Sequence, residues 1–170
     1  MIIAETERLV LSKITVDDAS FLLELMNTSG WLKYNGDRNV KTLDQARNHI
    51  ENNQLKCYQT YGYGYYKIQI KDENLKSIGT TGLLKRNNLE HVDIGFSLLP
   101  EYYKKGYGFE AATAIVKLAK NTFNIKTLSA ITLPINKPSI HLLEKLGLSY
   151  QKTIKPFDDE KELLLFVKNL

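Results

Sequence analysis

The stretch from Val92 to Ala112 reads VDIGFSLLPEYYKKGYGFEAA and predicts a strand, a loop and the start of a helix in succession. Apolar side chains alternate over its first third, which is the period of a strand, and Pro100 ends this pattern. A basic loop with two glycines follows, and apolar residues then recur at helical spacing, at Ala112, Ile115, Val116 and Ala119. Gly106 and Gly108 therefore lie where the loop becomes the first turn of a helix.

A glycine-rich loop that turns into a helix is suited to binding an anion. The first N–H groups of a helix lack partners within the helix, and the helix dipole places partial positive charge there. Glycines also let a ligand approach the backbone closely. We therefore expect a phosphate-bearing ligand at a segment that we call the phosphate loop, which consists of Lys104, Lys105, Gly106, Tyr107, Gly108 and Phe109.

Two common phosphate-binding motifs fit this loop poorly. The GxxxxGK[ST] pattern of nucleotide-binding loops is absent from the chain. The segment from Gly106 to Ala111 satisfies the GxGxxG/A pattern of dinucleotide-binding folds, but that pattern requires its first glycine directly after a strand. It also requires an acidic residue about 20 positions later, and the segment from Lys126 to Ile131 has none. A dinucleotide site is therefore disfavoured.

The segment Tyr103-Lys104-Lys105-Gly106-Tyr107-Gly108 resembles motif A of the GNAT acetyltransferases, a [Q/R]xxGx[G/A] loop that cradles the pyrophosphate of coenzyme A. Tyr103 stands where Gln or Arg is usual. An aromatic residue there, after Pro100-Glu101-Tyr102, is similar to the branch that includes the ribosomal-protein-alanine N-acetyltransferases. The segment from Glu7 to Leu11, followed by a helix, is similar to the opening of the same branch.

A second segment, Asn136 to Gly147, reads NKPSIHLLEKLG and is similar to GNAT motif B in its Asn, its Ser and its terminal EKLG. Two motifs in the correct order and spacing extend the resemblance over essentially the whole chain. It implies an enzyme that moves an acetyl group from acetyl-CoA to a primary amine, of a protein N-terminus or a small molecule. The family's reaction is direct attack in a ternary complex.

The resemblance also implies roles for individual residues. The pantetheine arm would run between the Val92 strand and a later strand, pairing with main chain near Ser97, Leu98 and Leu99, with oxyanion donors from Phe96 to Leu98. Asn136 would hold the pantetheine amide, and Leu143 is a further predicted contact. Many members protonate the leaving thiol with a tyrosine in the motif B helix, where this chain has leucines. Ser139 matches the position used in the alanine-acetyltransferase branch; a helix cap is the alternative role.

The general base is predicted from the face of the Val92 strand. His91, Asp93 and Ser97 alternate on one face of a strand that we expect to be covered on both sides, so a polar residue there needs a reason. Asp93 is the leading candidate for orienting or deprotonating the amine, directly or through water, with His91 and Glu90 behind it. A solvated or salt-bridged carboxylate remains the alternative.

Composition limits the other possibilities. The net charge is +4, but basic residues are dispersed among acids, so nucleic acid is not expected as the principal ligand. Cys57 is the single cysteine and the three histidines are scattered, so no metal site is predicted. No apolar run reaches about 18 residues, and the N-terminal residues do not resemble a signal peptide. We therefore expect a cytoplasmic protein without a membrane segment, a monomer or a homodimer.

The predicted fold class is α/β (α+β), a single GNAT-like domain over residues 1–170. We expect a mixed central sheet of about seven strands, with flanking helices. An antiparallel meander covers Gly64 to Leu98. A right-handed crossover then makes the strand from Thr127 to Leu133 parallel to the Val92 strand. Earlier in the chain, the capping box Thr42-Leu43-Asp44-Gln45 begins a helix that runs to about Asn53.

Trp31 to Val40 is predicted to be a loop between two helices. The resemblance implies that this helical pair forms one wall of the acceptor site, with Trp31 to Val40 and Tyr58 to Gly64 supplying the acceptor contacts. Trp31 is either part of that wall or a core residue. Two rival functions remain open at this point. One is a CoA-binding sensor or interaction protein without catalysis, suggested by the missing helix tyrosine. The other is a basic RNA-associated protein.

Overall fold

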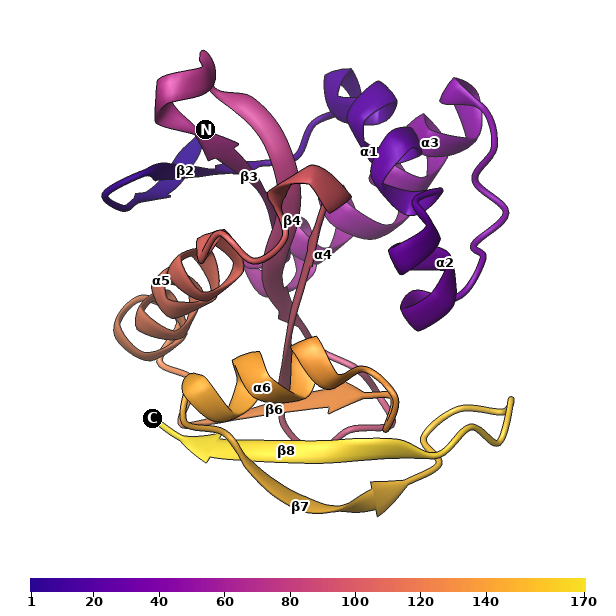
Figure 1. Cartoon of the computed structure of the whole chain (residues 1–170), viewed down its shortest axis with the longest axis vertical. Coiled ribbons are helices and arrows are strands. Elements are labelled where there is room, and N and C mark those ends of the chain that lie inside the picture. Colours follow the sequence, from indigo (N-terminus) through magenta and orange to yellow (C-terminus); the bar gives the residue numbers. More distant parts are fainter.

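The computed structural model describes all 170 residues and contains one mixed sheet of eight strands with helices packed around it (Figure 1). The strands are β1 Ile2–Glu5, β2 Leu9–Lys13, β3 Tyr65–Ile70, β4 Lys76–Leu84, β5 Val92–Leu98, β6 Thr127–Thr132, β7 Ser149–Ile154 and β8 Leu163–Asn169. The α-helices are α1 Ala19–Met26, α2 Ser29–Asn35, α3 Leu43–His49, α4 Lys56–Tyr61, α5 Tyr107–Asn121 and α6 Lys137–Lys145. None of the helices combines the length and the apolar character needed to cross a membrane.

The strand order is β1-β2-β3-β4-β5-β6-β8-β7, and only β5 and β6 are parallel to one another. The meander β3-β4-β5 and the parallel crossover through α5 confirm the prediction. The expected number of about seven strands was too low by one, because β1 pairs with β2 at the edge of the sheet. β1 has four residues and is only partly buried, so its sequence carries little alternation.

The parallel pair is short. β5 and β6 are in register only at Val92 with Leu128 and at Asp93 with Ser129. β6 continues to Thr132 along β8, and β5 continues to Leu98 along β4, so the two strands part beyond Asp93. α5 and α6 lie beside these strands (Figure 1). The sheet therefore has a gap at its centre, next to the phosphate loop.

Two helix predictions were wrong in their extent. Much of the predicted loop from Trp31 to Val40 is helical, because α2 begins at Ser29, and the Thr28 side chain caps it by accepting from the Trp31 N–H at 3.3 Å. The helix after Thr42 has the predicted capping box, but it does not stop near Asn53. It continues through a π-helical segment, Ile50–Leu55, into α4, since no residue breaks it before Gly62 adopts φ +77°.

The hydrophobic core occupies both sides of the central strands. α5 turns a row of small and branched residues inward, and it packs against β2, β4 and β5. In Figure 1, α5 and the group α1–α3 appear on opposite sides of β4. Because apolar layers hold the central strands from two sides, the main chain of β5 is fixed where it borders the gap.

Candidate active site

The phosphate loop has the backbone geometry of an anion site. Gly106 precedes α5 with φ +82°, and Lys104 also lies in the left-handed region with φ +59°. The first backbone bond of the helix runs from Glu110 N to Gly106 O, and no side chain caps this end. The N–H groups of Tyr107, Gly108 and Phe109 therefore have no partner within the helix, as an anion site requires.

The two glycines of the loop have different reasons to be glycine. Gly106 needs its positive φ. Gly108 is buried, and an added Cβ would lie 3.1 Å from Leu142 Cδ1 on α6 and 3.6 Å from Leu98 Cδ1 on β5. Gly108 thus lets α5, α6 and β5 meet closely at the point where the gap reaches the loop.

Aromatic rings and lysines surround the loop. The Lys105 ammonium lies 5.3 Å from the Tyr102 ring centroid, and the Lys145 ammonium lies 4.3 Å from that of Phe109. Tyr103, the departure from the motif, is largely exposed, and its hydroxyl reaches α2 so closely that a Cβ on Gly30 would lie 2.6 Å from it. Positive charge therefore surrounds the loop, and Tyr103, the residue before it, contacts α2.

The direction of the β5 main chain narrows the predicted pantetheine contacts. Leu99 donates its N–H to Ile78 O at 2.8 Å, so its main chain faces β4. Alternate residues of an antiparallel strand point the same way, which turns the main chain of Ser97 toward β4 as well. Phe96 and Leu98 face the gap instead. Of the predicted residues on this strand, only these two offer free N–H and C=O groups to a ligand.

α6 presents Asn136 and Ser139 at its first turn. The Asn136 side chain caps the helix by accepting from the Ser139 N–H at 3.2 Å, which leaves its own NH₂ group without a partner in the protein. Because Asn136 supplies the cap, the Ser139 hydroxyl is not used for capping, and it makes no hydrogen bond. Both side chains are half-buried. Leu143 is only 1 % exposed and packs in the core, so its side chain offers almost no surface to a cofactor.

Asp93 is buried at the point where β5 and β6 part. Its side chain is 3 % exposed, and its Oδ2 accepts from Arg86 Nε at 2.9 Å. Burial raises the pKa of Asp93 to about 6, although the Arg86 charge, its hydrogen bond and the Ile131 main-chain amide oppose this. Its Oδ1 is buried without a hydrogen-bond partner. The salt-bridged alternative is therefore realised, with one oxygen left over.

Sequence reasoning missed the partners of Asp93. Arg86 lies in the turn after β4, and Tyr65 on β3 places its hydroxyl against Gly95, in the space that a side chain there would occupy. Tyr65 faces the same side of the sheet as Asp93, because Tyr65, Gly82 and Gly95 are directly opposite one another. Burial, followed by the Asp93 charge, raises the pKa of Tyr65 to about 12. Only the strand register brings these groups together.

Other predicted groups lie apart from this cluster. His91 is 3.6 Å from the exposed Glu90 and borders a separate surface cavity of about 450 Å³ beside Gln151 and Lys152. Trp31 is half-buried against the core, and its indole N–H is buried without a hydrogen-bond partner. Trp31 therefore packs as a core residue with an unpartnered donor, and its role in the acceptor wall stays a prediction.

Comparison with known proteins identifies the family. Residues 8–149 match the family model described as acetyltransferase (GNAT) domain. The uncharacterized N-acetyltransferase YoaA of Bacillus subtilis is 24% identical over 157 residues, which cover 91% of this chain and 87% of YoaA.

Solved structures share the fold. The ribosomal-protein-S5-alanine acetyltransferase of Vibrio fischeri superposes with a TM-score of 0.82 at 20% identity, covering 99% of this chain and 96% of that one. RimL, a ribosomal L7/L12 α-N-protein acetyltransferase in complex with coenzyme A, superposes with a TM-score of 0.84 at 15% identity, covering 100% and 98%. Together with the family match and the named relative, the loop, the gap and the fold lead to one conclusion: the chain belongs to the GNAT acetyltransferase family and is an acetyl-CoA-dependent N-acetyltransferase.

Proposed function

We propose that this enzyme transfers the acetyl group directly from acetyl-CoA to a primary amine while both are bound. The observation that carries the proposal is the gap between β5 and β6, which begins beyond Asp93 and lies next to the phosphate loop. A thioester in this gap would be reached from the α5 and α6 side, leaving the Asp93 and Tyr65 side for the amine. Two substrates on two sides of one gap require no acyl-enzyme intermediate.

The donor is held mainly by main chain. The free N–H groups at the start of α5 bind the pyrophosphate, with Lys104 and Lys105 adding positive charge. The pantetheine arm lies along β5, where Phe96 and Leu98 face the gap, and the Asn136 NH₂ group donates to one of its amides. The same β5 N–H groups stabilise the oxyanion that forms when the amine nitrogen attacks the thioester carbon.

Ser139 completes the reaction on the donor side. When the C–S bond breaks, the sulfur leaves as a thiolate and takes up one proton, and the attacking nitrogen gives up one. In this proposal the Ser139 hydroxyl relays the proton, giving one to the thiolate while it takes one from solvent water. It is suited to this because it is half-buried, makes no hydrogen bond within the protein and is not the helix cap.

Asp93 acts on the amine side. It is only 2 % exposed, so it works through a bound water at its free Oδ1 and not by touching the amine. The pKa of about 6 leaves the carboxylate ionised at neutral pH, and Arg86 fixes its orientation. Asp93 is thus a positioning residue for the acceptor, and the proton leaves through the water.

The acceptor is proposed to be a primary amine of a protein N-terminus or of a small molecule. The two solved relatives above are named as enzymes that act on ribosomal proteins. The acceptor wall is formed by α2 and its neighbours, with Trp31 contributing the part of its half-buried ring that remains exposed. The chain acts as a monomer or a homodimer.

The proposal is tested by a screen for coenzyme A release. The full chain is mixed with acetyl-CoA and with peptides that begin with Ala or Ser, polyamines or amino sugars, and N-terminally acetylated peptides of the same sequence serve as controls. We expect release with at least one amine and none with its acetylated control. Initial rates that vary both substrates should give intersecting lines, whereas parallel lines would indicate an acyl-enzyme.

Thermal melting with acetyl-CoA shows whether a negative screen is informative. A ligand at 100 times its dissociation constant adds about 2.7 kcal/mol to stability. A clear shift with acetyl-CoA, but no coenzyme A release with any amine, would contradict the proposed transfer and favour a sensor.

A further inference from the structure

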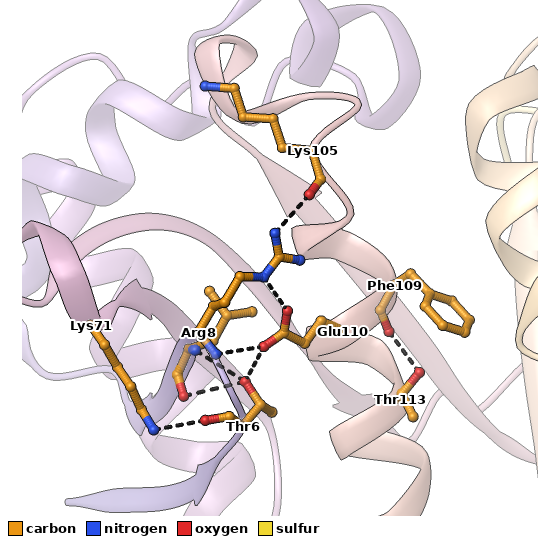
Figure 2. Close-up of polar contacts among 8 residues, drawn as sticks. Thr6, Arg8, Lys71, Lys105, Phe109, Glu110 and Thr113 are labelled. Carbon is orange, nitrogen blue, oxygen red and sulfur yellow. Dashed lines mark hydrogen bonds and ion pairs between the residues drawn. The ribbon is translucent and has the colours of Figure 1, made fainter.

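Glu110 in the first turn of α5 is bound by three donors from the connection between β1 and β2. Its Oε1 accepts from the Thr6 hydroxyl at 2.5 Å and from the Arg8 N–H at 2.9 Å, and its Oε2 accepts from Arg8 Nε at 2.7 Å (Figure 2). Thr6 is anchored in turn, because Lys71 donates to its carbonyl at 2.7 Å. Residues about one hundred positions apart in the chain thus converge on one carboxylate.

Arg8 also contacts the phosphate loop itself. Its Nη1 donates to Lys105 O at 3.0 Å, and its guanidinium carbon lies 4.5 Å from the centroid of the Tyr107 ring. Its Nη2 lies 3.2 Å from where a Cβ on Gly106 would be. Figure 2 shows the side chain extending from Glu110 to the Lys105 carbonyl. One guanidinium therefore contacts Lys105 and Tyr107 and lies beside Gly106 between them.

These contacts are exposed on the Arg8 side and more buried on the Glu110 side. The Arg8 side chain is 41% exposed and the Glu110 side chain 18%, so the ion pair is only partly removed from water and its share in the free energy of unfolding is modest. The loop, in contrast, needs support. Lys104 and Gly106 are both in the left-handed region, and no side chain caps α5. An arginine that binds the Lys105 carbonyl and stacks on Tyr107 holds the free N–H groups in one direction.

Arg8 has a second role, which is to neutralise the negative charge of Glu110. Burial raises the pKa of Glu110, but the hydrogen bonds from Thr6 and Arg8 outweigh it, and the pKa lies below its usual value. The carboxylate is therefore ionised, in the same helical turn that is to bind an anion. Without the arginine, this negative charge would oppose the pyrophosphate.

We propose that Thr6, Arg8 and Glu110 form an N-terminal latch that holds the phosphate loop in its pyrophosphate-binding conformation. Arg8 is its central positioning residue and also neutralises Glu110. A groove of about 660 Å³ runs from Gly106 along α5, with Thr6 to Arg8 forming its other wall, so the latch lies at the end of that groove next to the loop. This inference rests on the proposed pyrophosphate site at Lys104 to Phe109.

The test compares two donors in the full-length enzyme, acetyl-CoA and acetyl-pantetheine, which share the thioester and the arm but differ in the pyrophosphate. Arg8→Met should raise KM for acetyl-CoA about tenfold, with kcat little changed, since a charge-assisted contact is lost. The kcat/KM with acetyl-pantetheine should stay as in the wild type. Arg47→Met is the matched control, because Arg47 forms an exposed ion pair with Asp44 on α3, away from the loop.

The proposed neutralisation of Glu110 by Arg8 predicts how further variants should behave. Glu110→Gln should raise KM for acetyl-CoA less than Arg8→Met does. The double variant Arg8→Met/Glu110→Gln should bind acetyl-CoA better than Arg8→Met alone, because the unpaired carboxylate is gone. Arg8→Lys, which keeps the charge but not the planar fork, should fall between the wild type and Arg8→Met and remains informative if Arg8→Met does not fold.

Three results would overturn the latch. They are an unchanged KM for acetyl-CoA in Arg8→Met or Arg8→Lys, an equal loss with acetyl-CoA and acetyl-pantetheine, and a double variant no better than Arg8→Met. A different result would remove its foundation: a wild-type enzyme with no preference for acetyl-CoA over acetyl-pantetheine has no pyrophosphate site at this loop.

Discussion

The proposed donor side and the proposed acceptor side of the active site are built in different ways. The phosphate loop is one continuous segment, Lys104 to Phe109, and the groups proposed to bind the pyrophosphate are main-chain N–H groups at a helix start. The proposed acceptor side gathers side chains from separate elements, including Trp31 on α2, Tyr65 on β3 and Asp93 on β5. A site built from main-chain groups of one segment is therefore visible in the local sequence, whereas a site built from side chains depends on how distant segments pair.

Gly108→Val should have the largest effect, a loss of coenzyme A binding on the donor side. In Gly108→Val, the new Cβ would lie 3.1 Å from Leu142 Cδ1, and its methyl groups would push α6 and β5 away from the start of α5. The dissociation constant for coenzyme A should rise at least about 100-fold, because the free N–H groups are displaced. Calorimetry measures this. Lys120→Met, at an exposed position in the last turn of α5, should bind normally. A folded Gly108→Val protein with wild-type affinity would contradict the site.

Ser139→Ala separates chemistry from binding on the same side. The turnover number should fall about 100-fold, the usual worth of one positioned proton donor. The dissociation constant for coenzyme A should barely change, since Asn136 and not Ser139 caps α6. Single-turnover kinetics with a pre-bound donor tests this. Full activity in Ser139→Ala would mean that another group protonates the thiolate.

The proposed role of Asp93 on the acceptor side predicts how the reaction rate depends on pH. Because its pKa is about 6, the rate should rise with pH up to roughly that value and then level off, as the ionised form accumulates. Asp93→Asn should remove this limb and lower the plateau. Arg86→Met should move the limb to higher pH, since the Arg86 charge lowers the pKa of Asp93. A pH–rate profile that is the same in all three proteins would exclude Asp93 from the reaction.

The raised pKa of Asp93 also affects the stability of the protein, which should fall with rising pH where the rate rises. A carboxyl group whose pKa is higher in the folded state binds more protons there, so its contribution to stability falls as pH rises from about 4 to about 6. Denaturant titrations at several pH values should show this loss in the wild type. Asp93→Asn should be flatter over that window if Asp93 is the group responsible.

The smallest expected effect concerns the acceptor wall. Trp31→Phe removes a buried N–H without a partner, which offsets part of the lost packing, so the free energy of unfolding should change by less than about 2 kcal/mol. KM for the amine should rise severalfold, about 3-fold or more, while KM for acetyl-CoA stays constant. Leu75→Ala, at an exposed position in the turn between β3 and β4, is the control. An equal change in both KM values would place Trp31 in the core alone.

Structural features that arise from neighbouring residues in the chain were predictable from the sequence. Alternation in β5, the glycines Gly106 and Gly108 and apolar spacing in α5 all lie within one segment, so they predicted the strand, the loop and the helix. The capping box at Thr42 and the crossover to β6 follow equally general rules. The extent of α2 and the continuation to Tyr61 were missed, because weak local signals decide where a helix ends.

Which side chains and main-chain groups meet depends on the fold, and the sequence pattern did not show it. The register of β4 and β5 turned Phe96 and Leu98 toward the gap and Ser97 and Leu99 away from it. Packing buried Leu143, and folding brought Arg86 to Asp93 and Arg8 to Glu110. The physical reason is distance along the chain. Hydrogen bonds within a turn leave a pattern in the sequence, whereas contacts between distant segments exist only after the sheet has formed.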